Sequence, residues 1–374
     1  MEATPLDHVF ITRVDDPPAG TRLAVKDILD TAGIRTTYGS LVFENHVPDK
    51  TAEAVVRLER AGYADVGKAN LHEFAFGMTS ENAHYGTVPN PIAPGRIAGG
   101  SSGGSAAALA AGLADAALGS DTAGSIRAPS ACCGTVGFKP SYGLVPTAGC
   151  FPLAPSFDHV GPMARTVPEC VRLMAALSPD LDPVPEIAPG DVQVGFAWIV
   201  EADPLVGARV EEAAATFPHR RDLHLPAMPS GVRHVRMRET AETHVELFSR
   251  YRDRYGHDVA EKLDRCLEVT DREYEAGLET RERYRERLAA LMRGIDVVLT
   301  PTLPMVAPPV GLGDLALRDR MTQFTYPFNA IGAPALAVPC GAAEAGLPAS
   351  VQVVARPGMD ALVLGVGTLL DSRR

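Results

Sequence analysis

The sequence lacks a hydrophobic run long enough to cross a membrane. Its longest weakly polar stretch, residues 106–118, is too short to span a bilayer and is interrupted by Asp115. Residues 1–5 contain neither the basic charges nor the apolar run of a secretory signal peptide. We therefore expect no membrane association and a cytoplasmic location.

Cysteine is scarce, and positive charge is in deficit. The 374 residues include six cysteines, none in a CxxC pair or at a Cys/His spacing typical of a metal site. We expect these cysteines to be reduced and buried, and we expect neither a metal nor a cofactor. Asp and Glu outnumber Lys and Arg by 46 to 35, giving a net charge of −11. This charge argues against nucleic acid or an anionic membrane as a partner.

The order of strands and helices indicates an α/β fold. Periodicity predicts strands over residues 22–26, 64–68, 192–200, 295–299, 335–338 and 350–354. Helices are predicted over residues 51–61, 167–177 and much of 231–293, whereas residues 1–20, 137–143 and 156–162 are predicted to be irregular or rich in loops. Strands in both halves favour a single domain over residues 1–374. We expect residues from about 180 to 295 to be a helical elaboration that shapes the substrate pocket.

Two glycine turns that carry serines are the most distinctive feature. The first, residues 99–105, reads GGSSGGS, and the second, residues 120–125, reads SDTAGS. An alanine-rich segment, residues 106–117, lies between them. Alanine favours helix and glycine permits backbone conformations closed to other residues, so the pattern predicts a turn, a short helix and a second turn. Backbone N–H groups in such turns can converge on a developing negative charge.

The first turn has other interpretations. Its composition is typical of a flexible linker, although it leads directly into an apolar helix. A P-loop is unsupported, because Gly104 is followed by Ser105 and not by lysine. Residues 99–103 also fit the G-x-S-x-G nucleophile elbow, in which Ser101 would attack, but residues 90–95 before it read as loop where the elbow needs a strand. Among possible bases, His72 and His84 are candidates, although structural histidines are commoner.

The segment from Gly99 to Ser130 resembles the signature of the amidase signature family, the serine hydrolases with a Ser–cis-Ser–Lys triad. Further segments resemble the family in the same order: residues 23–27, 33–40, 70–74, 82–91, 137–143, 156–165, 299–302, 326–335, and 346–348 with 351–352. The resemblance implies the family's fold, a mixed β-sheet core covered on both sides by α-helices. It also implies an amidase that hydrolyses the C–N bond of a small-molecule amide without a cofactor.

The resemblance assigns a role to each triad residue. Ser125 is the implied nucleophile, Ser101 the proton relay that follows a cis Gly100–Ser101 bond, and Lys26 the base. The implied oxyanion hole consists of the backbone N–H groups of Thr122, Ala123, Gly124 and Ser125. A serine hydroxyl needs an adjacent base. A lysine can serve near neutral pH only where burial favours its uncharged form.

Substrate contacts are expected from Met78, Gly100 and Arg127. Arg127 is a candidate for binding a substrate carboxylate, and its alternative is a structural ion pair with Asp121 or Asp158. Most members of the family have glycine at the position of Ala123, and their middle region is longer. The short middle region leaves the acyl pocket either more open or covered by the partner of a homodimer.

Three alternatives to a carboxylic amidase stay open at this point. The chain could hydrolyse carbamoyl or urea-like amides. It could release ammonia as one component of a tRNA-dependent amidotransferase, which would require a partner protein. In a different class, it could be a catalytically inactive binding scaffold, although Lys26, Ser101 and Ser125 are all present.

Overall fold

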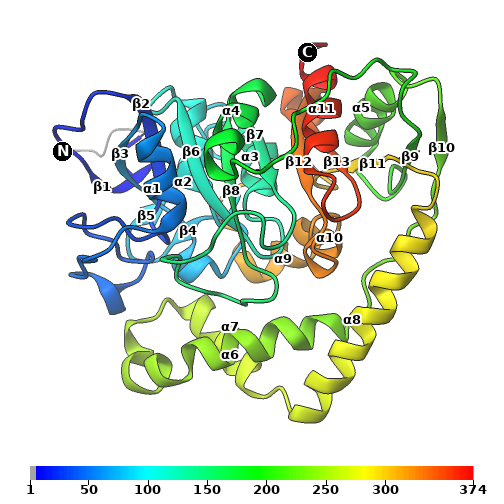
Figure 1. Ribbon diagram of the computed structural model, residues 1–374. Coiled ribbons are helices and arrows are strands. Elements are labelled where there is room, and N and C mark those ends of the chain that lie inside the picture. The colour runs from blue at the N-terminus through cyan, green and yellow to red at the C-terminus, as the bar shows by residue number, and fades with distance from the viewer. Residues whose placement is uncertain (1–5, 374) are drawn as a thin grey trace.

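A computed structural model describes residues 6–373, and a mixed sheet of eleven strands runs through this part of the chain (Figure 1). In spatial order the strands are β1 (Phe10–Arg13), β3 (Tyr63–Ala69), β2 (Thr21–Lys26), β6 (Ala116–Asp121), β8 (His159–Ala164), β7 (Val136–Lys139), β12 (Ala335–Ala342), β13 (Pro348–Val354), β11 (Val297–Pro301), β9 (Val194–Phe196) and β10 (Arg220–Asp222). Two short strands, β4 (Glu81–Asn82) and β5 (Gly86–Thr87), pair separately. The strand β2 is parallel to β3 and β6, whereas β12 is antiparallel to β7 and β13.

Helices cover both faces of the sheet. They are α1 (Glu53–Arg60), α2 (Gly103–Ala110), α3 (Arg127–Cys133), α4 (Val167–Leu177), α5 (Pro204–Ala214), α6 (Val232–Tyr251), α7 (His257–Leu267), α8 (Asp271–Leu291), α9 (Asp314–Thr322), α10 (Tyr326–Ala330) and α11 (Asp360–Asp371). Alternation along β2 explains the two layers, because Leu23 and Val25 join the core beneath α1, α4 and α11 while Ala24 joins the alanine-rich core beneath α2. The predicted α/β fold with a mixed sheet covered on both sides is confirmed.

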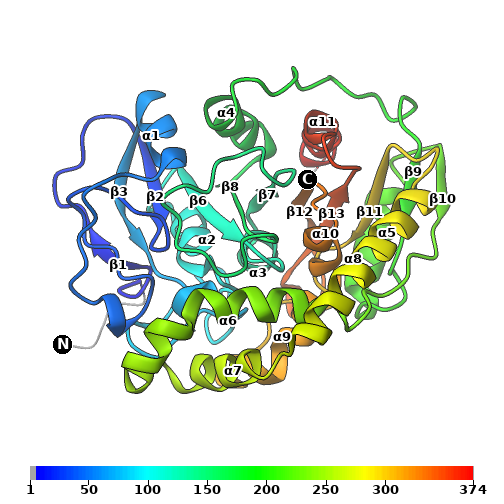
Figure 2. The same cartoon turned by 60° about the horizontal axis from the view of Figure 1, so that its bottom comes forward.

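The long helices of the second half form a separate group. In both views α6, α7 and α8 lie together along one side of the molecule, and α6 contacts the other two (Figures 1 and 2). The predicted helical elaboration was too broad, since residues 180–230 also contain β9, α5 and β10. The strand β9 pairs with β11 in the main sheet, so this segment extends the core.

Glycine and proline concealed several strands from the sequence pattern. Residues 137–143 and 156–162 were expected to be loops, but β7 and β8 lie in the middle of the sheet. Gly161 is required there, because a Cβ at this position would lie 2.3 Å from the carbonyl oxygen of Phe138. The predicted helix over residues 106–117 was also wrong at its end, since α2 stops at Ala110 and Ala116 begins β6. Likewise β1 lies within residues 1–20, of which residues 1–5 are outside the described chain.

Over residues 6–373 no helix combines the length and the apolar composition that crossing a membrane requires.

Candidate active site

Two parallel strands bring the predicted triad together. Lys26 is the last residue of β2, and the second glycine turn follows β6, which ends at Asp121. Because β2 and β6 are parallel neighbours, their carboxyl ends meet at the same edge of the sheet, where α/β proteins place their ligand sites. The first glycine turn reaches this edge because Ser101 lies just before α2, which packs against both strands.

Lys26 is buried and contacts two serines. Its Nζ donates hydrogen bonds to Ser101 Oγ at 2.7 Å and to Ser120 Oγ at 2.8 Å. Burial lowers the pKa of Lys26 to about 7, although Cys150, Asp121 and Asp158 act in the opposite direction. The peptide bond before Ser101 is cis. The contact with Ser120 was not predicted, because a serine at the end of an apolar strand carries no signal of its own.

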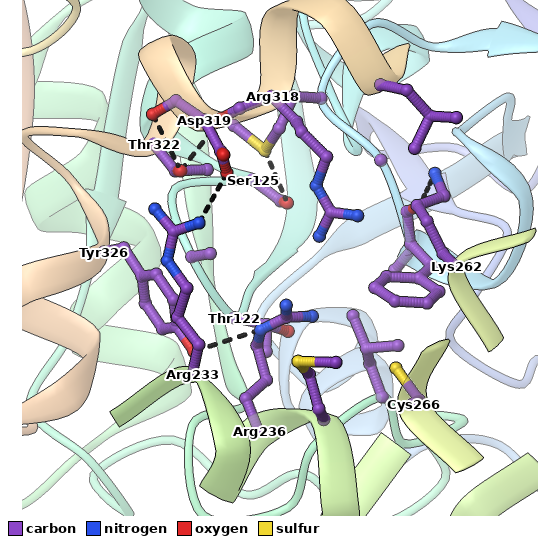
Figure 3. A pocket seen from close by; sticks show the side chains of 18 of the residues that line it. Thr122, Ser125, Arg233, Arg236, Lys262, Cys266, Arg318, Asp319, Thr322 and Tyr326 are labelled. Carbon is purple, nitrogen blue, oxygen red and sulfur yellow. Dashed lines mark hydrogen bonds and ion pairs between the residues drawn. The ribbon is translucent and has the colours of Figure 1, made fainter. Parts of the chain in front are cut away.

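Ser125 lies at the wall of a pocket of about 200 Å³ (Figure 3). Its backbone oxygen accepts a hydrogen bond from Ser102 N at 3.1 Å, which ties the two glycine turns together. Its Oγ lies 3.9 Å from Met78 Sδ, and within the described residues it makes no hydrogen bond to Ser101.

Asp121 shapes the turn that precedes Ser125. Its Oδ1 accepts a hydrogen bond from Gly124 N at 2.7 Å, and its Oδ2 accepts one from Ile126 N at 3.1 Å. The N–H group of Gly124 is therefore already engaged, which contradicts its assignment to the oxyanion hole. In the described chain the N–H groups of Thr122, Ala123 and Ser125 have no hydrogen-bond partner, and these three residues line the pocket.

The alanine in this turn is accommodated without strain. Ala123 is not among the residues with positive φ, so its methyl group does not force the backbone into an unfavourable region. Gly124, by contrast, has φ 135°, and a Cβ there would lie 2.3 Å from Thr325 Oγ1. The turn therefore needs glycine at position 124 and tolerates a side chain at position 123.

Arg127 is not available to a substrate. It is completely buried, and its guanidinium holds Asp121 with two hydrogen bonds of 2.9 and 3.0 Å. Further hydrogen bonds reach Gln352 and Asn329 side-chain oxygens and the Thr325 carbonyl oxygen. The candidate role in substrate binding was therefore wrong, and the alternative ion pair with Asp121 is the one that forms.

The ion pair also controls the charge of Asp121. Burial alone would raise the pKa of this carboxyl, but Arg127, with Lys139 and Asn329, outweighs burial and holds the pKa well below its usual range. Asp158, the other partner considered for Arg127, instead accepts hydrogen bonds from Thr122 Oγ1 and from the backbone of residues 153 and 154.

The remaining candidates differ in their positions. Met78 lines the pocket, whereas Gly100 does not, and an added Cβ at Gly100 would be 2.9 Å from Ser80 Oγ and from the Met78 backbone. The described residues that line the pocket include neither Gly100 nor the two candidate histidines. His72 contacts Asp258 at 2.8 Å, and His84 contacts Glu73 at 3.2 Å.

One buried cluster outside the triad has the composition of a metal site. His72, Asp258 and Asp314 bring their ligand atoms within 4.8 Å of one another. Lys262 Nζ lies 2.9 Å from Asp258, 2.8 Å from Asp314 and 3.4 Å from His72. An ammonium group therefore occupies the position that a cation would take. Asp314 also accepts a hydrogen bond from Met78 N, so the cluster supports the pocket wall.

The pocket walls come from segments far apart in the sequence. The turn around Ser125 and residues 75–78 form one side, while α6, α7 and α9 form the other. The contribution of α6 and α7 agrees with the expectation that residues 231–293 shape the pocket, but α8 does not line it and α9 was not foreseen.

Comparisons with known proteins cover nearly the whole chain. Residues 6–193 and 219–364 match the family model described as Amidase. A glutamyl-tRNA(Gln) amidotransferase subunit of Haloarcula marismortui is 34% identical over 411 residues, covering 95% of this chain and 96% of the relative. The corresponding subunit of Thermus thermophilus is 37% identical over 402 residues, covering 93% and 83%. A crystal structure of an amidase matches with a TM-score of 0.87 at 34% identity, covering 94% of this chain and 84% of the other.

Proposed function

The chain belongs to the amidase family, whose members hydrolyse amide C–N bonds, and on this basis we propose that it cleaves a carboxylic amide through an acyl-enzyme on Ser125. One observation carries the proposal. Lys26, whose pKa burial lowers to about 7, is hydrogen-bonded to Ser101 at 2.7 Å, and Ser125 lines the pocket. A neutral amine linked to a serine is the base that a second serine needs for attack.

Acylation begins with proton transfer along the two serines. Ser125 Oγ attacks the carbonyl carbon while its proton passes to Ser101 Oγ, and the proton of Ser101 passes to the neutral amine of Lys26. The C–O bond forms and the carbonyl π electrons move to oxygen, which becomes the oxyanion. The free N–H groups of Thr122, Ala123 and Ser125 are the proposed donors to this charge, and losing one such donor typically costs about 3 kcal/mol of transition-state stabilisation.

Collapse of the tetrahedral intermediate breaks the C–N bond. The leaving nitrogen takes a proton from Ser101, which is resupplied by the Lys26 ammonium, so the amine departs neutral. Water then attacks the ester carbonyl of Ser125, and the same two residues accept its proton and return one to Ser125 Oγ. The products are a carboxylic acid and an amine, and Lys26 ends in its starting state.

Replacement of each triad residue tests this mechanism. Ser125→Ala should abolish both turnover and covalent labelling by a fluorophosphonate, in which Ser125 Oγ displaces fluoride from phosphorus. Ser101→Ala and Lys26→Ala should reduce both by at least about 10³-fold, as loss of a triad member does in other serine hydrolases. If Ser125→Ala still labels and Ser101→Ala does not, Ser101 is the nucleophile and the assignment is wrong.

The amidotransferase relatives support a second candidate function. Two of them, both named as subunits of a glutamyl-tRNA(Gln) amidotransferase, match over more than nine-tenths of this chain. In this alternative the chain releases ammonia from glutamine and passes it to a partner protein. Incubation of the isolated chain with glutamine distinguishes the two: release of glutamate favours the alternative, and hydrolysis of simple amides without it favours a free-standing amidase. Activity confined to carbamoyl or urea-like amides would instead indicate a hydrolase of that substrate class.

We also propose a cytoplasmic location. All six cysteines are free, which suits the reducing cytoplasm. A homodimer that covers the pocket is tested by light scattering on the purified chain. Turnover of any amide by that chain would argue against an inactive binding scaffold.

A further inference from the structure

Two arginines face the pocket without a hydrogen bond or ion pair to a described carboxylate. Arg236 on α6 is 7% exposed, and its Nε donates a hydrogen bond of 3.0 Å to the Tyr326 hydroxyl. The guanidinium of Arg318 on α9 makes no hydrogen bond or ion pair with any other described residue. Both guanidinium groups lie over the ring of Phe76, at 5.4 and 5.3 Å from its centroid. Figure 3 shows the Arg318 guanidinium in the open centre of the pocket, with the head of Arg236 and the Ser125 hydroxyl facing the same space.

The other cations of the pocket are neutralised. Lys262 is held by Asp258 and Asp314, and Arg265 by Glu261. Arg233 is paired at 2.7 Å with Asp319, whose side chain is exposed (Figure 3). Among the described cations that line the pocket, Arg236 and Arg318 are therefore the two that form no ion pair with a carboxylate.

Two like charges in a partly desolvated pocket are unfavourable. Burial and the positive charge of Arg236 lower the pKa of Arg318, and the more distant carboxylates of Asp314 and Asp319 offset this effect only in part. Removing a charge from water costs free energy that only a partner of opposite charge recovers. No described carboxylate forms a hydrogen bond or ion pair with the Arg318 guanidinium, so an anion that entered the pocket could pair with both guanidinium groups.

We propose that Arg236 and Arg318 bind a carboxylate carried by the substrate, which makes the substrate a small amide that also bears a carboxylate group. A guanidinium presents its donors in a planar fork that matches the two oxygens of a carboxylate. The pocket volume of about 200 Å³ limits the substrate to a few carbon atoms between the two groups. The inference rests on the proposed acyl-enzyme, because the anion would position the amide carbonyl against Ser125.

Binding of matched acids and amides tests the carboxylate site. Malonate, succinate and glutarate are titrated calorimetrically into the protein alongside their neutral diamides. We expect at least one diacid to bind about 10- to 100-fold more tightly than its diamide, as hydrogen bonds to charged groups typically contribute. Arg318→Met and Arg236→Met should each reduce this preference about tenfold or more.

Arg320→Met is the matched control. Arg320 lies on the same helix but pairs with Asp203 outside the pocket, so its loss should leave the preference for the diacid intact. The inference is overturned if no diacid binds more tightly than its diamide, or if both pocket variants keep the wild-type preference. Melting curves of each variant establish that the fold is retained. If Arg236→Met does not fold, the result for Arg318→Met decides the test, because Arg318 is less buried than Arg236.

Labelling of Ser125 by a fluorophosphonate separates this inference from the proposed function. Preference for a diacid without labelling of Ser125 supports the carboxylate site and overturns the acyl-enzyme. Labelling of Ser125 without preference for any diacid supports the acyl-enzyme and overturns the carboxylate site.

Discussion

Lys26 Nζ and Ser101 Oγ lie 2.7 Å apart in a buried position at the carboxyl ends of two parallel strands. Burial lowers the pKa of Lys26 to about 7, so the amine is largely neutral above that pH and charged below it. In the proposed mechanism only the neutral amine can accept the proton of Ser101. The contact would therefore connect the ionisation of Lys26 to the rate of acylation.

The first prediction concerns the pH dependence of this rate. The value of kcat/KM should rise through a midpoint near pH 7 and level off above it, because the neutral form of Lys26 accumulates as pH rises. Steady-state rates between about pH 5.5 and 9 measure the profile. Lys50→Met, which removes an exposed lysine, should leave it unchanged. A flat profile with chemistry rate-limiting would contradict the assignment of Lys26 as the base.

The second prediction concerns Ser120, which sequence patterns did not identify. Ser120 Oγ accepts a hydrogen bond from Lys26 at 2.8 Å and so favours the ammonium form. Ser120→Ala should lower kcat/KM about tenfold through loss of one hydrogen bond that orients the amine. It should also move the midpoint of the pH profile to lower pH, because the cation loses an acceptor.

Ser105→Ala is the control for this experiment. Ser105 is also buried, but its hydroxyl donates to the Leu118 carbonyl and does not contact Lys26. A shift of the midpoint in both variants, or in neither, would argue that Ser120 has no specific effect on the lysine.

The third prediction concerns the buried ion pair of Arg127 and Asp121. Arg127→Met should reduce the free energy of unfolding by about 3–5 kcal/mol, because it leaves a buried carboxylate without its partner. Urea unfolding followed by circular dichroism measures the change. Arg285→Met removes an exposed pair with Glu282 and should cost no more than about 1 kcal/mol. Equal losses in the two variants would contradict the structural role of Arg127.

The sign of the pH effect on this pair can be tested as well. In the wild type the low pKa of Asp121 contributes stability above its unfolded pKa of about 4, and this contribution is lost as the pH falls below that value. Without Arg127, burial is opposed only by the weaker effects of Lys139 and Asn329, so the pKa of Asp121 rises and the carboxyl protonates more readily in the folded state. The destabilisation caused by Arg127→Met should therefore be smaller at pH 5 than at pH 8.

The fourth prediction compares adjacent residues of the turn. Gly124→Ala should destabilise the protein by at least about 1–3 kcal/mol, since φ at this position is 135° and the added Cβ would collide with Thr325. Activity should fall with it, because the same turn holds the N–H groups of Ala123 and Ser125. Ala123→Gly should leave kcat/KM within a few-fold of the wild type. Melting temperatures and rates of both variants test this, and a tolerated Gly124→Ala would show that the turn adjusts.

Much of the fold follows from periodicity, and the errors have physical causes. The strand before Lys26 and the helix over residues 167–177 were predicted because their apolar residues alternate or recur at helical spacing. The strands β7 and β8 were missed because Gly137 and Gly161 read as loop residues, although close backbone approach in the centre of the sheet requires them. Propensity describes the local chain, whereas this requirement comes from a neighbouring strand.

By itself the sequence determined the α/β class, the family and the three residues of the proposed triad, because two serine-bearing glycine turns and an early lysine form a pattern that is readable along the chain. Only the tertiary structure decided which charged groups are neutralised. Arg127 pairs with Asp121, six residues away, and with Gln352 across the fold, while Arg236 and Arg318, 82 residues apart in the sequence, meet over Phe76 without forming an ion pair. Charge balance depends on distance in space and on burial, and neither quantity is written in the order of the residues.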